Sequence, residues 1–85
     1  AEGDALLQDL AAAKRSGVRP GSAEAAALAA RHRAAIERFY PCGGEMHRGL
    51  VEMYLADPRF TAYYDDVEPG LAQFVHDVVI ASIMR

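Results

Sequence analysis

The sequence predicts an all-α domain of about five helices. In five segments apolar residues recur at three- and four-residue steps, and no stretch shows the strict alternation of a β-strand. Short connections containing Gly or Pro separate these segments. With 85 residues the chain has the length of one domain, and we expect residues 1–85 to form it. A core of this size is thin, so a shallow groove or a closing pocket is easier to build than a large catalytic cleft.

The first two helices are marked by caps and stops. Asp4 is the expected cap of the first helix, which carries three leucines and ends at Gly17, with Lys14 and Arg15 in its last turn. Ser22 is the expected cap of the second helix. One long apolar stripe is predicted behind that cap, formed by Ala25, Leu28, Ala29, His32, Ile36, Phe39 and Tyr40.

Three more helices follow a break at residues 41–44. The third is expected to start near Glu45, and its predicted apolar face consists of Met46, Leu50, Met53 and Tyr54. Asp57 then caps a short fourth helix that has Pro58 in its first position. Gly70 precedes the last helix. The predicted inner face of that helix consists of Leu71, Phe74, Val75, Val78 and Val79, widened by Ile80 and Ile83.

Charge and composition argue against several classes of function. The net charge is −3, and residues 49–85 hold only two basic side chains, so the chain lacks the basic cluster that direct nucleic-acid binding requires. The single cysteine excludes an internal disulfide and fits a reducing compartment. No apolar run approaches the ~20 residues of a membrane span. We therefore expect a cytoplasmic protein, and a chain that begins with Ala1 resembles an excised fragment.

Few residues could support catalysis or metal binding. Cys42 precedes a helix start and His47 follows five residues later, but no further Cys or His completes a metal site, so we expect no metal and no cofactor. A Cys42–His47 nucleophile pair lacks an evident third group, and a packed thiol is the simpler interpretation. His32 is more simply a core histidine than a ligand contact. The adjacent Asp65 and Asp66 fit capping and solvation better than acid–base catalysis.

The aromatic and methionine residues offer a more specific hypothesis. All seven aromatic residues follow residue 38, and most of them, with two methionines, lie between residues 39 and 64. Each buried tyrosine hydroxyl needs a partner, so a small core gains little from four tyrosines. Methionine adapts to irregular partners, and tyrosine offers a flat surface with a polar group. This mixture suits a cleft for a large apolar ligand, although composition alone leaves a plain core equally open.

The stretch FYPCGGEMH at residues 39–47 begins a longer pattern, C-G-x-E-M-H-x-x-L-x-E-M-Y, which D-x-R-F-T and P-G-L-A follow. In this pattern the chain resembles the antibiotic-recognition domain of thiostrepton-induced, TipA-type regulators of the MerR family. The resemblance covers residues 39–84 well, whereas the first two helices match only in pattern. It implies a globin-like helical fold with a deep cleft for bulky antibiotics such as thiopeptides. It also implies a MerR-type DNA-binding domain in full-length relatives, with no DNA binding by the sensor itself.

The same resemblance implies a site and a departure from the family. In the best-studied relative, a cysteine at the position of Gly49 attacks the antibiotic, so the glycine here argues against covalent capture. We predict a non-enzymatic sensor that binds or sequesters a hydrophobic antibiotic. The alternatives are a protein-interaction module with a Met- and Tyr-rich groove, and a small Cys-dependent enzyme. The predicted ligand-binding residues are His32, Phe39, Tyr40, Cys42, Met46, His47, Gly49, Leu50, Met53, Tyr54, Tyr63 and Tyr64.

Overall fold

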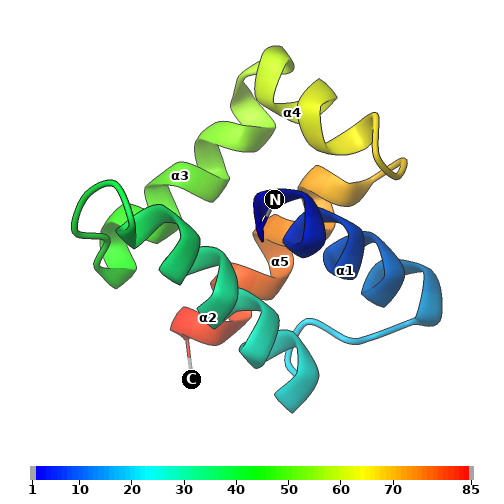
Figure 1. Cartoon of the computed structure of the whole chain (residues 1–85), viewed down its shortest axis with the longest axis horizontal. Helices are drawn as coiled ribbons and strands as arrows, with labels where there is room; N and C mark the ends of the chain where they lie inside the picture. Colours follow the sequence, from blue (N-terminus) through cyan, green and yellow to red (C-terminus); the bar gives the residue numbers. More distant parts are fainter. Residues whose placement is uncertain (1, 85) are drawn as a thin grey trace.

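Five helices, as predicted, make up the computed structural model, which describes the backbone of residues 2–84 and the side chains of residues 5–84. They are α1 (Glu2–Ser16), α2 (Ala23–Glu37), α3 (Gly44–Ala56), α4 (Pro58–Asp65) and α5 (Leu71–Ile83). No strand occurs among the described residues. Helix α5 lies at the centre of the bundle, where it packs against each of the other four helices (Figure 1).

The core forms around α5 because that helix is the most apolar of the five and is buried over most of its circumference. Its inward side chains meet small alanines from α1 and α2 and larger side chains from α3 and α4. This cluster consists of Leu6, Leu10, Ala11, Ala25, Ala29, Val51, Tyr54, Tyr64, Leu71, Ala72, Val75, Val78 and Val79. Helix α1 packs on α2 and α5, and α4 packs on α3 and α5.

Most of the predicted helix ends are confirmed. Gly17 adopts φ +84° after α1, where the amides of Gly17 and Val18 donate to the carbonyls of Lys14 (3.2 Å) and Ala13 (3.0 Å) in a Schellman arrangement. At the start of α2, the Ser22 hydroxyl accepts from the Ala25 amide at 3.2 Å. The Asp57 carboxylate likewise accepts from the first turn of α4. Asp4 is misplaced, because α1 already includes Glu2 and Asp4 therefore lies within the helix.

Two predicted apolar faces are wrong in detail. Helix α2 ends at Glu37, so Phe39 and Tyr40 lie in the following turn and not on its stripe, and Phe39 is 85% exposed. Pro41 follows Tyr40 and disfavours helical geometry there, so the helix cannot continue through this turn. On α3 the buried residues are His47, Val51 and Tyr54. Tyr54 is thus buried as predicted, but His47 and Val51 are buried in place of Met46, which is exposed. Leu50 and Met53 are partly buried against the core.

Contacts between distant segments fix the two helices that flank the core. Glu68, in the loop before α5, accepts from Lys14 at 3.4 Å and from Arg15 at 3.0 Å, which holds the end of α1 against this loop. Asp65, at the end of α4, accepts from the Ala72 amide at 3.0 Å and so caps α5, in agreement with the capping role expected for it. These contacts join the end of α1 to the loop before α5, and the end of α4 to the first turn of α5.

Candidate ligand-binding cleft

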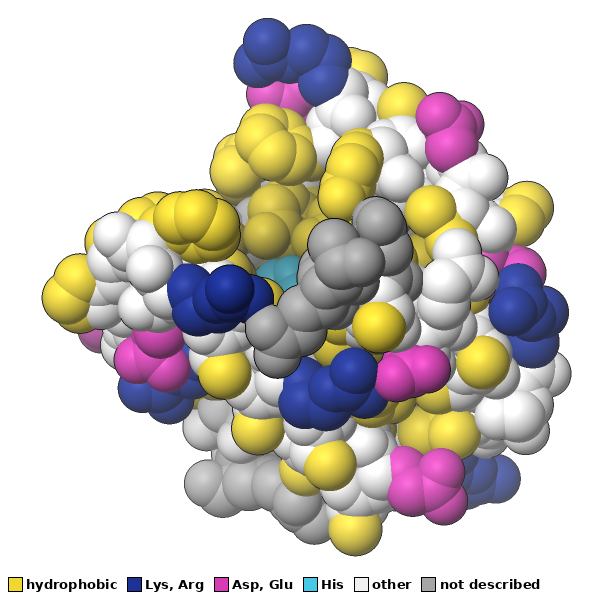
Figure 2. All heavy atoms as spheres, viewed as in Figure 1, with side chains coloured by type: hydrophobic (Ala, Val, Ile, Leu, Met, Phe, Trp, Pro, Cys, Tyr) yellow, Lys and Arg dark blue, Asp and Glu magenta, His cyan; other side chains and the backbone are white. Residues whose placement is uncertain are grey.

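A cleft opens between α1 and α4 above the core. It consists of two adjoining cavities of about 490 Å³ and 250 Å³ that share Tyr54, Tyr63 and Tyr64. Arg59 and Phe60 complete the larger cavity. The smaller one is also lined by Leu6, Leu7, Leu10, His32, Ala35, Ile36, Phe39 and Tyr40. Figure 2 shows this hollow, with hydrophobic side chains on its sides and a histidine at its floor. Hereafter "the cleft" means these two cavities together.

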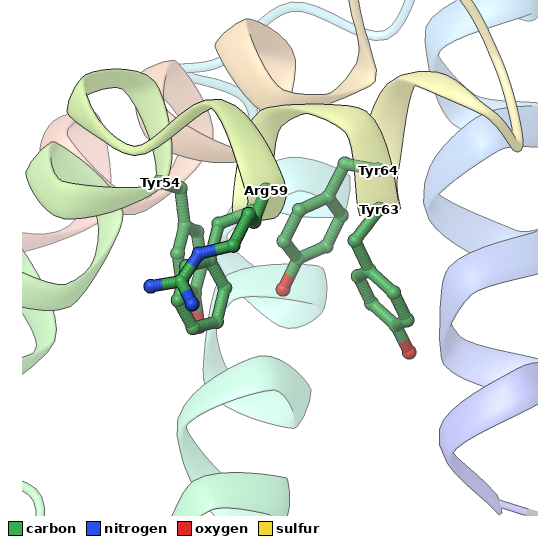
Figure 3. Close-up of a pocket in the computed structure, with 5 residues that line it drawn as sticks. Tyr54, Arg59, Tyr63 and Tyr64 are labelled. Atoms are coloured by element: carbon green, nitrogen blue, oxygen red, sulfur yellow. The ribbon is translucent and has the colours of Figure 1, made fainter.

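The wall on the α4 side is a row of aromatic rings. The ring of Tyr54 stacks on Phe60 with centroids 5.6 Å apart, and it lies 5.0 Å from Tyr64. Tyr63 meets Tyr64 edge-on at 5.3 Å. Figure 3 shows Tyr63 and Tyr64 extending from α4 into the same space, with Arg59 beside Tyr54. Tyr64 is buried and Tyr63 is 57% exposed, so the row runs from the core to the cleft mouth.

A buried polar row lies at the floor of the cleft. His32 Nδ1 lies 2.8 Å from His47 Nε2, and His32 Nε2 lies 3.1 Å from the Tyr64 hydroxyl. Both histidines are buried. Burial lowers the pKa of His32 to about 4, with His47 contributing, and it also lowers the pKa of His47. Both rings are therefore neutral at pH 7, and each link of the row needs one donor and one acceptor.

The far end of this row reaches another surface of the molecule. His47 lines a separate hollow of about 480 Å³, whose other lining residues come from α2, α3 and α5 and include Arg33, Glu37 and Ser82. Arg33 donates to the Cys42 carbonyl at 2.7 Å and lies 3.6 Å from the Glu37 carboxylate. The row His47–His32–Tyr64 thus connects a polar hollow with the aromatic cleft.

The rim of the larger cavity carries one ion pair. Arg59 Nη2 and Asp57 Oδ2 are 3.0 Å apart, and the Arg59 side chain is 86% exposed. Hydrogen bonding to Arg59 lowers the pKa of Asp57. No carboxylate lies among the described residues that line either cavity. The interior of the cleft is therefore apolar except for tyrosine hydroxyls and His32, which suits uncharged ligands.

The structure brings six of the twelve predicted site residues to the cleft: His32, Phe39, Tyr40, Tyr54, Tyr63 and Tyr64. The other six do not line it. Cys42 is fully buried, and burial raises the pKa of its thiol. His47 lies behind His32, while Met46 and Gly49 are exposed on α3. A Cβ at Gly49 would meet no atom within 4 Å, so we find this position on open surface and not on the wall where we expected it.

Some cleft residues were not among those predicted. Three leucines were expected in the first helix, Leu6, Leu7 and Leu10, but helical spacing does not distinguish a leucine that fills the core from one that borders a cleft. For the same reason, helical spacing on α2 could not assign Ala35 and Ile36 to the cleft. Phe60 is one of the seven aromatic residues that follow residue 38, although it was not assigned to the site. Arg59 carried no signal beyond its place in the D-x-R-F-T motif.

No group of three or more Cys, His, Asp or Glu residues that could hold a metal ion occurs in the described part of the chain. None of the described helices is both long and apolar enough to cross a membrane.

Several known proteins are similar to this domain in sequence. Residues 1–82 match the model of the TipAS antibiotic-recognition domain. The chain is 42% identical over 86 residues to the HTH-type transcriptional activator TipA of Streptomyces coelicolor, covering 99% of this chain and 34% of that protein. It is 35% identical over 81 residues to the activator mta of Bacillus subtilis, covering 94% of this chain and 31% of that protein.

A third relative is the HTH-type transcriptional regulator SkgA of Caulobacter vibrioides, at 33% identity over 82 residues, 94% of this chain and 32% of that protein. The chain thus spans about a third of the length of the curated relatives that it matches. No solved structure gave a significant match. The family model covers both the helices that resembled the family closely and the first two, which matched it only in pattern. The chain therefore belongs to the TipAS antibiotic-recognition domain family.

Proposed function

We propose that this domain senses a bulky, largely apolar antibiotic by binding it reversibly in the cleft between α1 and α4, without chemical conversion. The observation that carries the proposal is the aromatic cleft itself, because a small domain gains no stability from leaving such side chains at a surface hollow. The cleft has the ~300–1,000 Å³ volume typical of small-molecule sites. A thiopeptide is larger than that, so one part would enter and the rest would cover exposed Phe39, Phe60 and Tyr63.

The cleft's construction also supports a signalling role. Its walls come from α1, α2 and the turn after it, α3 and α4; of these, α1 packs on α2 and α5, whereas α4 packs on α3 and α5. A ligand that bridges these helices restricts their relative movement, which is a differential interaction of the kind that shifts a conformational equilibrium. In a longer chain that carries a helix-turn-helix domain, as the relatives' names indicate for them, this ordering would be the signal.

A titration with thiostrepton, followed by amide NMR shifts, tests the proposal. We expect shifts at cleft residues such as Ala35, Tyr40 and Tyr63, with small effects at Gly49 and Met46 on the exposed side of α3. Leu55→Ala provides a matched control, because Leu55 is a partly exposed apolar residue that borders neither cavity. Shifts that spread over α3 and leave the cleft unaffected would contradict the site.

The alternative of a protein-interaction module rests on one observation, the 85% exposure of Phe39 beside the cleft. An amphipathic helix could place its apolar side chains in the same groove. A helical peptide rich in Leu and Phe, titrated in the same way, separates the two functions. Saturable binding of the peptide with no response to thiostrepton would favour the interaction module.

A further inference from the structure

The buried row His47–His32–Tyr64 has no role in holding the apolar part of a ligand, yet it ends at the cleft floor. All three side chains are buried, and each link is a short contact between polar atoms, 2.8 Å and 3.1 Å. Burying a polar group costs free energy unless all its hydrogen-bonding atoms have partners, and an apolar core of the same shape would avoid that cost. The presence of the row at the site therefore indicates a function.

Two arrangements of protons satisfy the same heavy-atom positions. In the first, the Tyr64 hydroxyl donates to His32 Nε2, and His32 Nδ1–H donates to His47 Nε2. The Tyr64 oxygen then offers only lone pairs to the cleft. In the second, His47 Nε2–H donates to His32 Nδ1, and His32 Nε2–H donates to the Tyr64 oxygen. The Tyr64 hydroxyl proton then points away from the row, toward the cleft and the neighbouring Tyr54 hydroxyl, its other hydrogen-bonding neighbour, so a ligand acceptor takes the place of Tyr54.

The two arrangements contain the same number of protons and the same charge. Conversion of the first into the second moves the Tyr64 proton to His32 Nε2 and the His32 Nδ1 proton to His47 Nε2. His47 Nδ1 releases its proton to water, and the Tyr64 oxygen takes one from water. The hollow beside Arg33 and Ser82, which His47 lines, gives water access at the far end of the row. The conversion therefore needs no charged intermediate to remain in the core.

We infer that the row makes the cleft floor a reversible hydrogen-bonding position: Tyr64 accepts from a ligand donor or donates to a ligand acceptor, and the tautomers of His32 and His47 change to match. This inference rests on the proposed ligand-binding function. It assigns to the ligand an uncharged polar group at its buried end, such as a ring nitrogen, a carbonyl or an amide N–H. Tyr64 is the residue that contacts this group, and His32 and His47 position its proton.

Geometry and charge both favour an uncharged group at that point. The cleft-lining residues include no carboxylate that could balance a ligand cation, and the one lining cation, Arg59, is at the exposed rim. The lowered pKa of His32 keeps its ring neutral over the physiological range. The floor thus recognises a dipole, of either direction, and not a charge.

Three small aromatic probes distinguish this mechanism from simple filling of the cleft. Indole has one N–H donor, quinoline has one ring-nitrogen acceptor, and 1-methylindole has neither. Long-range ¹H–¹⁵N correlation spectra of the ¹⁵N-labelled protein report which nitrogen of each histidine carries the proton. We expect indole to favour His32 Nδ1–H and quinoline to favour His32 Nε2–H. His76, which lies beside Asp77 and lines neither cavity, is the internal reference and should not respond.

A matched pair of variants tests the role of the hydroxyl. Tyr64→Phe should weaken binding of both indole and quinoline by about 3- to 10-fold, the effect of one net hydrogen bond, and should leave 1-methylindole within twofold. Tyr63→Phe removes the neighbouring hydroxyl of the cleft wall, which lies outside the row, so any loss of affinity that it causes should be smaller than that of Tyr64→Phe, and the His32 tautomer should still follow the probe. Because both changes keep the ring, the apolar wall is preserved in each variant.

The possible results have separate meanings. Cleft shifts with all three probes but one His32 tautomer throughout would overturn the inference and leave the proposed function standing. Equal losses in Tyr63→Phe and Tyr64→Phe would also overturn it. If none of the probes, 1-methylindole included, shifts the resonances of Ala35 and Tyr63, the cleft does not accept aromatic ligands, and the proposed function and this inference both fail.

Discussion

At the scale of single residues, the core of this domain contains an unusual polar element. His32, His47 and Tyr64 occupy buried positions, where an unpaired polar group would cost ~1–3 kcal/mol. The contacts between the three side chains avoid that cost, and no buried side-chain nitrogen or oxygen lacks a partner among the described residues. Burial disfavours the charged form of both imidazoles, which makes the stability of the fold sensitive to acid.

Unfolding at different pH values tests this sensitivity. Folded His32 has a pKa of about 4, against 6.5 when unperturbed, so between these values the unfolded chain binds a proton that the folded chain does not. Stability should therefore fall as the pH falls from 6.5 to 4, by about 3 kcal/mol from His32, with His47 acting in the same direction. Urea denaturation across this range measures the effect.

The His32→Gln variant is the control for that experiment. It should be less stable at pH 7, because the row is broken, but its stability should vary less between pH 6.5 and 4. A wild-type stability that stays constant over this range would contradict the buried, neutral state of His32.

Adjacent tyrosines on α4 should respond differently to truncation. Tyr63 is 57% exposed at the cleft mouth, so Tyr63→Ala should weaken binding of a thiopeptide by ~1–3 kcal/mol and leave the fold intact. Tyr64 is buried in the core and bonded to His32, so Tyr64→Ala should cost ~3–5 kcal/mol of stability. Thermal melts combined with ligand titrations separate the two effects. If Tyr63→Ala lowers the melting temperature as much as Tyr64→Ala and leaves affinity unchanged, the assignment is wrong.

At the scale of secondary structure elements, two glycines differ in whether the backbone needs a residue without a Cβ. Gly49 lies within α3 in helical geometry, and an added Cβ would meet nothing within 4 Å. Gly70 precedes α5 with φ +81°, and a Cβ there would lie 3.1 Å from Lys14 Cε. The first glycine therefore weakens its helix without an evident packing reason, whereas the second permits the turn that starts the central helix.

Alanine substitutions at these glycines should have opposite signs. Gly49→Ala should stabilise the domain by ~0.5–1 kcal/mol, because alanine has the higher helix propensity and no contact is disturbed. Gly70→Ala should destabilise it by about 1 kcal/mol or more, since a left-handed conformation is unfavourable for a residue with a Cβ. Urea denaturation of the two variants measures both. A destabilised Gly49→Ala would show that this position packs against something.

At the scale of the whole molecule, the cleft arises where the bundle is incompletely filled. Helix α5 is surrounded by the other four, but α1 and α4 do not close over the tyrosines between them. The ion pairs of Glu68 with Lys14 and Arg15 hold the end of α1 against the loop before α5, and an ion pair between Asp9 and Arg31 at 2.8 Å joins the middle of α1 to α2. A ligand in the cleft would contact the leucines of α1 and the tyrosines of α4 directly, whereas α5 is already enclosed.

A ligand should therefore protect α1 and α4 more than the core. Hydrogen–deuterium exchange with and without thiostrepton should show the largest gain in protection in residues 5–10 and 58–65, because these segments line the cleft. Residues of α5, already enclosed, should gain less. Uniform protection of all five helices would instead indicate stabilisation by mass action alone.

The isolated domain should be a monomer. The described residues form one helical core around α5 and have no heptad pattern for a coiled coil. Sedimentation equilibrium should give the mass of a single chain, 9.2 kDa. An obligate dimer would show that exposed residues such as Phe39 and Met84 lie in an interface.

The sequence by itself determined the five helices and most of their ends, because these depend on local interactions. Ser22 and Asp57 bond to amides within three residues, and Gly17 supplies the conformation that ends α1. The family motif in residues 39–72 identified the class of domain, and the family match confirms it. Apolar periodicity also placed α5 in the core, since nearly every residue on its inner side is apolar.

Only the tertiary structure decided which apolar residues line the cleft. Helix α3 is apolar over so much of its circumference that its sequence allows two orientations, and packing against α5 selected the face with His47, Val51 and Tyr54. That choice turned Met46 and Gly49 outward and brought His47 to His32, fifteen residues earlier in the chain. Contacts of this kind depend on how helices distant in sequence pack together, and helical period specifies a face only when the polar side is unambiguous.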